Sequence, residues 1–168
     1  MFLNKKGQVF SWDMLIAISV FIFILVASIT MWDFYRAKSE IIDLRADMEF
    51  AAQNAMVGLI TTSGDPGNWY VSPSFEVSSL GLVSGRDYVL DGDKVDKLVE
   101  WNATYYEEIK SSLGVRKYDM YLSFLNQTGE IYGFGIDSPS NAEAVVRIER
   151  VCMIDDDVFK VVMEVWDG

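Results

Sequence analysis

Few side chains in this sequence are suited to nucleophilic or acid–base catalysis. It contains no His, and Cys152 is its single cysteine. The lack of His excludes His-based proton transfer and removes the commonest metal ligand. One cysteine cannot close a disulfide within the chain or form a thiolate cluster. Because Cys152 falls in an apolar strand pattern, we interpret it as a buried, inert thiol. We therefore expect no catalytic residues, no metal site and no cofactor.

Two acidic clusters and one glycine-rich stretch are the remaining candidates for ligand binding. Residues 155–157 are three consecutive aspartates, and carboxylate oxygens suit Ca²⁺. They lack the spaced pattern of a calcium-binding loop, so a solvated hairpin turn is the better interpretation. Asp91, Asp93 and Asp96 are better explained by a turn and a helix cap, for which we expect Asp93. The Gly-x-Gly-x-x-Ser sequence at residues 133–138 lacks the third glycine of a dinucleotide-binding motif, and no helical pattern follows it.

Two Asn-x-Thr sequons are candidate glycosylation sites. They begin at Asn102 and Asn126. Asn126 lies in a predicted turn and is the better candidate, whereas Asn102 lies within a predicted helix. Both would be modified only outside the cytoplasm, so the sequons depend on the membrane topology argued next.

An uncharged apolar run dominates the N-terminal part of the chain. It extends from Met14 to Trp32, and about 20 such residues in a helix cross the hydrocarbon core of a bilayer. Lys5 and Lys6 precede the run, and a largely acidic region follows it. By the positive-inside rule, we expect a single-pass membrane protein with a cytoplasmic N-terminus and an extracytoplasmic head. The formal net charge of −11 makes nucleic acid an unsuitable partner.

The apolar run is longer than that of an ordinary secretory signal, and its small-residue cleavage pattern is poor. The sequence Lys5-Lys6-Gly7-Gln8, with a nearby Ser and an acidic residue, resembles the class III signal peptide of archaeal type IV pilin-like proteins. The resemblance implies that a prepilin peptidase cuts between Gly7 and Gln8 and leaves the apolar helix on the mature protein. The alternative is that Lys5 and Lys6 only orient an uncut anchor.

Ser11 and Asp13 match the family pattern with a shifted spacing. The common form is Gln-x-Ser-x-Glu, whereas this chain has Gln8-x-x-Ser11-x-Asp13. The resemblance implies a role in assembly, in which Asp13 pairs with the new terminal amine of a neighbouring subunit. The alternative is a helix cap, because a carboxylate in the first turn meets unpaired N–H groups and the positive end of the helix dipole.

The helical pattern continues beyond the apolar run, so we predict one helix from about Ser11 to Ile60. Apolar residues recur at intervals of three and four along Phe34, Ala37, Ile41, Leu44, Met48, Ala51, Ala55 and Leu59. A Thr-, Ser- and Gly-containing segment with Pro66 then ends the pattern. We expect the apolar stripe to pack on the chain's own head, and a dimeric coiled coil is the alternative.

The remaining residues predict a small α+β head. A connector at 64–92 carries apolar anchors such as Trp69, and an amphipathic helix should run from Asp93 to a stop at Gly114. Alternating apolar residues then predict two sequential hairpins, at 118–134 and 146–165. We therefore expect a C-terminal four-stranded, mostly antiparallel sheet laid against the long helix. This layout is pilin-like, and several head motifs, such as Gly64-x-Pro66-x-x-Trp69, also resemble archaeal pilin-like proteins.

These observations predict four segments and a non-enzymatic role. The segments are a leader at 1–7, a transmembrane helix at 8–33, its amphipathic continuation at 34–62 and a globular head at 63–168. The resemblance implies a type IV pilin-like subunit of an extracellular filament, and the elaborate acidic head favours a minor or priming subunit. Its partners would be the prepilin peptidase, the membrane and other pilin-like subunits contacted through the N-terminal helix. The alternative is an uncleaved membrane-anchored protein with a binding head.

Overall fold

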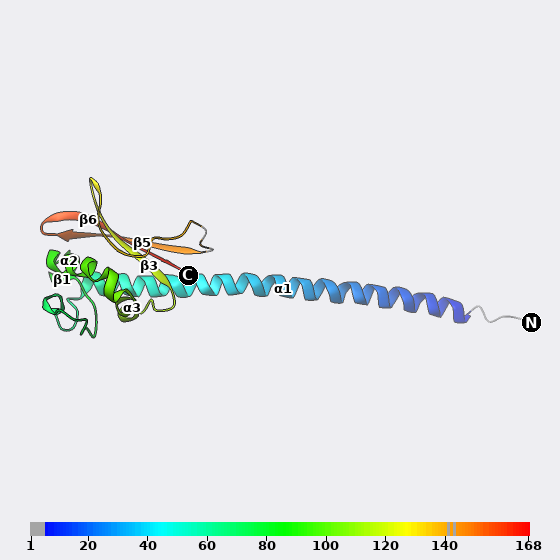
Figure 1. Cartoon of the computed structure of the whole chain (residues 1–168). Coiled ribbons are helices and arrows are strands. Elements are labelled where there is room, and N and C mark those ends of the chain that lie inside the picture. Colours follow the sequence, from blue (N-terminus) through cyan, green and yellow to red (C-terminus); the bar gives the residue numbers. More distant parts are fainter. Residues whose placement is uncertain (1–5, 141, 143) are drawn as a thin grey trace, which may run out of the picture. The chain divides into compact units, whose positions relative to one another are not determined.

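The computed structural model describes residues 6–140, 142 and 144–168 (Figure 1). The chain divides into two compact units, Met1–Asp43 and Leu44–Gly168, and the second is called the head below. The helices are α1 (Lys6–Thr61), η1 (Trp69–Val71), α2 (Gly92–Glu100) and α3 (Asn102–Ser112). The strands are β1 (Val83–Arg86), β2 (Val89–Leu90), β3 (Asp119–Asn126), β4 (Gly129–Gly135), β5 (Val145–Ile154) and β6 (Asp157–Trp166).

One mixed sheet organises the head. Among the described residues it has six strands in the order β1-β2-β5-β6-β3-β4. The β3–β4 and β5–β6 hairpins are antiparallel, as the alternating sequence pattern predicts, and β6 also pairs with β3. The prediction of four strands is wrong in two respects, because β1 and β2 extend the sheet and β2 runs parallel to β5. The sequence predicts one short strand at residues 86–90, but segments of four and two residues are too short for an alternating pattern to place them in the sheet.

The turn of the β5–β6 hairpin explains the aspartate cluster. Ile154 pairs with Asp157, so Asp155 and Asp156 form a two-residue loop. Both have positive φ, at 47° and 73°. A tight hairpin turn of the primed type requires this conformation, and Asp tolerates it better than most residues. The interpretation of residues 155–157 as a hairpin turn is therefore confirmed.

The last turns of α1 supply one wall of the head core. The buried residues of this segment are Met48, Ala52, Ala55, Met56, Leu59 and Ile60, and Leu44 and Ala51 pack at the edge of the same cluster. Within the head, the sheet lies along one side of these turns (Figure 1). The predicted packing of the stripe on the chain's own head is thus confirmed from Leu44 onward. Phe34, by contrast, is exposed.

The predicted amphipathic helix is broken at Trp101. The helices α2 and α3 replace it, and Asp91 rather than Asp93 caps the first, with its Oδ1 accepting the Asp93 N–H at 3.1 Å. Trp101 is buried in an aromatic cluster, with ring centroids 5.3 Å from Trp69 and 5.4 Å from Tyr105. Since no Gly or Pro marks this position, the break arises from the packing of the indole and not from local sequence. Gly114 ends the segment with a φ of +77°, as expected.

Candidate membrane segment and head surface

The first part of α1 has the length and composition of a membrane span. The segment Trp12–Arg36 contains 25 residues, and its apolar window of 18 residues has a mean hydropathy of 2.7. None of the segment is buried inside the protein. At 1.5 Å per residue this is about 37 Å of helix, which exceeds the ~30 Å hydrocarbon core of a bilayer. So large an exposed apolar surface requires lipid or another apolar partner.

The three Ser and Thr hydroxyls of the apolar run are satisfied within the helix. The hydroxyls of Ser19 and Ser28 donate to the carbonyls of Leu15 and Ile24 at 2.8 Å. Thr30 Oγ1 donates to the carbonyl of Ala27 at 3.0 Å. Because lipid offers no hydrogen-bond partners, these internal bonds remove the main cost of placing hydroxyls in a bilayer.

Aromatic side chains lie at both ends of the apolar run. Trp12 and Trp32 are exposed and are about 30 Å apart along α1, at 1.5 Å per residue. Tyr35 lies one turn beyond Trp32 and is also exposed. Trp and Tyr concentrate at the two membrane–water interfaces, so this spacing matches the thickness of a hydrocarbon core.

The predicted processing residues lie at the start of α1. Lys5 is outside the described residues. Lys6, Gly7 and Gln8 form the beginning of the helix, where the first N–H groups have no partner within the helix. Their side chains, like that of Ser11, are outside the described part of the structure. The Gly7–Gln8 bond therefore lies in a terminal turn, which is the part of a helix that opens most readily.

Asp13 is exposed and lies about two turns inside α1. The first turn of the helix contains no acidic residue. In the uncleaved chain Asp13 thus lies beyond the first turn, where the unpaired N–H groups occur. The helix-cap alternative remains a prediction for the processed chain. The assembly role of Asp13 remains a prediction.

The two sequons differ in how their asparagines are used. Asn102 begins α3, and its Oδ1 accepts the Gly135 N–H at 2.8 Å, which ties this helix to the end of β4. Asn126 ends β3, and its Oδ1 accepts the Thr128 N–H at 2.8 Å within the hairpin turn. Asn102 thus holds two distant elements together, whereas Asn126 makes only local bonds.

Two lysines of the head are buried, which the sequence does not predict. Lys94 Nζ donates to the carbonyls of Ser63 and Val83 at 2.8 and 3.0 Å, and burial lowers its pKa against the opposing charge of Asp91. The other is Lys110, whose Nζ is 2.9 Å from Asp119 Oδ1. In the sequence, both lysines occupy helix positions that are typically exposed to solvent. Their burial becomes evident only from their contacts in the folded protein.

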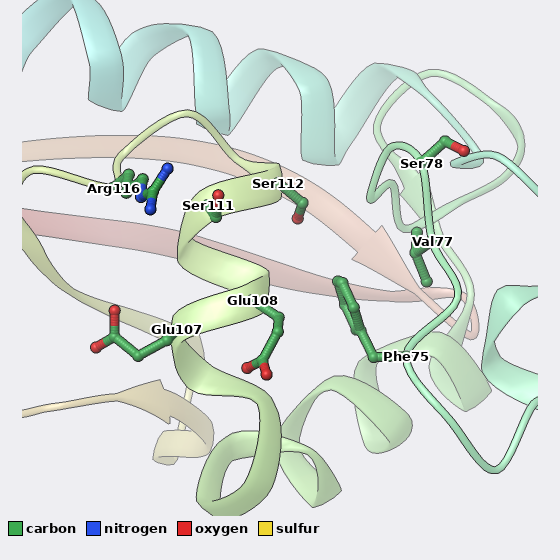
Figure 2. A pocket seen from close by; sticks show the side chains of 8 residues that line it. All are labelled: Phe75, Val77, Ser78, Glu107, Glu108, Ser111, Ser112 and Arg116. Carbon is green, nitrogen blue, oxygen red and sulfur yellow. The ribbon is translucent and has the colours of Figure 1, made fainter.

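One hollow on the head is a groove of about 540 Å³ between α3 and the connector. Its lining consists of Phe75, Val77, Ser78, Glu107, Glu108, Ser111, Ser112 and Arg116. Figure 2 shows Phe75 and Val77 on the connector and the two glutamates and two serines on α3. The Ser112 hydroxyl donates to the carbonyl of Ile109 at 2.8 Å and is not paired with a base. This groove is an open surface of mixed polarity, without the nucleophile–base pair of a covalent catalyst.

The remaining chemical candidates are accounted for by the fold. Cys152 is buried, and burial raises the pKa of its thiol to about 11, as suits an inert side chain. In the described part of the chain, no group of three or more Cys, Asp or Glu side chains is arranged to hold a metal ion. No protein family, curated protein or solved structure matches this chain in sequence or fold comparisons.

Proposed function

We propose that this chain is an archaeal type IV pilin-like subunit that is processed after Gly7 and assembles through α1. The observation that carries the proposal is that two parts of α1 have different surroundings. Its segment Trp12–Arg36 is apolar and uncovered, whereas its turns from Met48 to Ile60 form part of the head core. A filament subunit needs both properties, because the same helix must leave the bilayer and hold a folded head.

The apolar segment must be covered by apolar partners both in the membrane and in a filament. In lipid, its side chains meet acyl chains and gain little by pairing with one another. Once extracted, the same side chains would face water unless neighbouring helices cover them, so burial against other subunits becomes strongly favourable. The hydroxyls of Ser19, Ser28 and Thr30 are hydrogen-bonded within the helix, so they are satisfied both in lipid and in a filament.

Processing provides the direct test. The full chain would be expressed in membranes with and without a class III prepilin peptidase, and the products compared by intact-mass spectrometry. We expect the peptidase to remove the seven residues that end at Gly7. A Gly7→Leu variant should stay uncut and membrane-bound, because the bulky side chain blocks the cleavage site but leaves the apolar segment intact.

The alternative function makes the opposite prediction. An uncleaved single-pass anchor with a binding head would keep residues 1–7 in the presence of active peptidase. A known substrate of the same peptidase, expressed beside this chain, is the control that separates an inactive enzyme from an uncleavable chain. Cleavage of the control without cleavage of this chain would reject the pilin-like proposal and support the anchored alternative.

A further inference from the structure

The face of the sheet that points away from α1 has its own buried residues. Along β6, Val161, Met163 and Val165 belong to the head core, so the alternating Val162 and Glu164 lie on the opposite face. Val162 is nevertheless buried, and so is Ser123, which pairs with it from β3. These two residues lie in a hollow of about 370 Å³, lined by Tyr121, Ser123, Leu125, Glu130, Asp137, Ser138, Arg147, Val162 and Glu164.

Ser123 has an unusual environment for a hydroxyl. Only 6% of the residue is exposed, and its hydroxyl makes no hydrogen bond to the described part of the chain. In that part of the chain, every fully enclosed side-chain oxygen or nitrogen has a hydrogen-bond partner. The Ser123 hydroxyl is therefore not fully enclosed, and it is reached through the hollow. Water in the hollow can therefore hydrogen-bond this hydroxyl, and a bound polar group could take the place of that water.

The rim of the hollow carries an excess of negative charge. Glu130, Asp137 and Glu164 face a single cation, Arg147, whose Nη1 is 3.0 Å from Glu164 Oε1. Tyr121 donates its hydroxyl to Glu130 Oε1 at 2.5 Å. This hydrogen bond, together with burial and the three surrounding carboxylates, raises the pKa of Tyr121 to about 12. The rim thus favours a cation over a neutral or anionic ligand.

We propose that this hollow binds a primary alkylammonium group. An ammonium has three N–H donors, and the hollow offers three kinds of acceptor in the Ser123 hydroxyl, the rim carboxylates and Ser138. Val162 and Leu125 supply an apolar surface for the alkyl stem, and the Tyr121 ring lies beside it. The same chemistry occurs in a free aliphatic amine and in a lysine side chain of another protein. This proposal does not depend on filament assembly.

The test uses the full chain in a polyoxyethylene detergent, which carries neither amine nor sugar. Methyl NMR would follow Val162 and Leu125 during titration with pentylamine, with acetyl-lysine methylamide and with 1-pentanol. We expect both amines to give saturable shifts at these methyl groups, and pentanol to give none at the same concentration. Raising the salt concentration from 0.05 to 0.5 M should weaken amine binding, since ions screen the rim charges. A stronger response to the lysine amide than to pentylamine would identify a protein side chain as the better source.

Three variants assign the effect to the hollow. Ser123→Ala and Asp137→Asn should each weaken amine binding about tenfold, the expected loss for one hydrogen bond to a charged group. Glu108→Gln removes one carboxylate on α3, outside the hollow, and should leave binding unchanged. Unchanged methyl spectra away from the hollow would show that each variant is folded, and the exposed position of Asp137 makes its variant the safer one.

Several results would overturn the proposal. Equal shifts with pentanol would identify an unspecific apolar hollow. No saturable shift with either amine, or equal weakening by Glu108→Gln and Asp137→Asn, would also reject an ammonium site.

Discussion

Lys110 Nζ on α3 lies 2.9 Å from Asp119 Oδ1 at the start of β3, and the lysine side chain is only 8% exposed. Tyr106 joins the same group, because its hydroxyl accepts the Met120 N–H at 3.0 Å and lies 3.3 Å from Asp119 Oδ1. This arrangement locks the last helix of the head to a central strand of the sheet. It also leaves a buried ammonium whose less exposed carboxylate partner is Asp119.

Removing that carboxylate should destabilise the head. We expect Asp119→Ala to lower the free energy of unfolding by about 2 kcal/mol, because the buried Lys110 loses its main partner. Thermal unfolding of the full chain in detergent, followed by near-ultraviolet circular dichroism, measures the change. Glu107→Ala is the matched control, since Glu107 Oε1 lies 3.2 Å from the same ammonium but its side chain is 71% exposed. This variant should cost less than about 1 kcal/mol, and equal losses would contradict the argument.

The Lys110–Asp119 pair also predicts that the stability of the head depends on pH in the alkaline range. Burial lowers the pKa of Lys110, but hydrogen bonds to Asp119 and Glu107 and nearby charges raise it more, to above its usual 10.5. A raised pKa in the folded state means that the ammonium stabilises the fold below pH 10.5, and that this contribution is lost as pH rises through the folded-state pKa. We therefore expect the difference in Tm between the parent chain and Asp119→Ala to narrow above pH 10.5. A constant difference from pH 8 to 12 would rule out this linkage.

Met48 tests the role of α1 in the head core. Replacing it by Asp places an unpaired carboxylate in a fully buried position, which should cost several kcal/mol and approach the total stability of a small domain. Asn54→Asp, at an exposed position of the same helix, should change the stability by less than about 0.5 kcal/mol. If Met48→Asp melts within a degree or two of the parent, this face of α1 does not support the head.

Substitution of Asp13 should distinguish membrane insertion from filament assembly. Under the proposed function, Asp13→Asn keeps the size of the side chain but removes the charge that would pair with a neighbour's terminal amine. We expect the variant to be processed and to remain in the membrane, but to be absent from sheared filaments analysed by immunoblot. Normal incorporation of the variant would show that the charge is not needed for assembly.

The two sequons should differ in whether they are glycosylated and in how well they tolerate substitution of the asparagine. We expect an oligosaccharyltransferase that acts on folded chains to modify Asn126 and leave Asn102 unmodified, because only Asn102 bonds the backbone of β4. Peptide mapping by mass spectrometry would locate the glycan. Asn102→Gln should also lower the Tm of the head, whereas Asn126→Gln should shift it less; a glycan at Asn102 alone would contradict both expectations.

Long, regular patterns predicted their elements correctly. The β5–β6 hairpin follows from alternating residues on both sides of an aspartate turn, and Arg147 and Glu164 form the cross-strand pair that this register implies, at 3.0 Å. The apolar stripe of α1 likewise placed Met48 and Leu59 in the core. In each case the period of the sequence matches the period of the backbone over at least two turns or four alternations.

Features decided by distant contacts were not predicted. Trp101 lies within a continuous helical pattern, and the helix breaks there because its ring joins a cluster assembled from other segments. Ser123 occupies a polar place in an alternating strand, which is typical of a solvent-facing residue. Its burial depends on neighbouring strands and on Asp137 and Ser138 after β4, so the candidate ammonium site has no signal in the local sequence.

The strand order also bears on how copies of the head behave when crowded. Unpaired backbone groups at a sheet edge invite pairing with another copy, which leads to aggregation. One edge strand, β1, has four residues and an irregular register against β2. The other, β4, begins and ends with glycines at φ +131° and +110°. Neither edge offers a long flat template, so heads concentrated on a membrane or along a fibre can touch without joining their sheets.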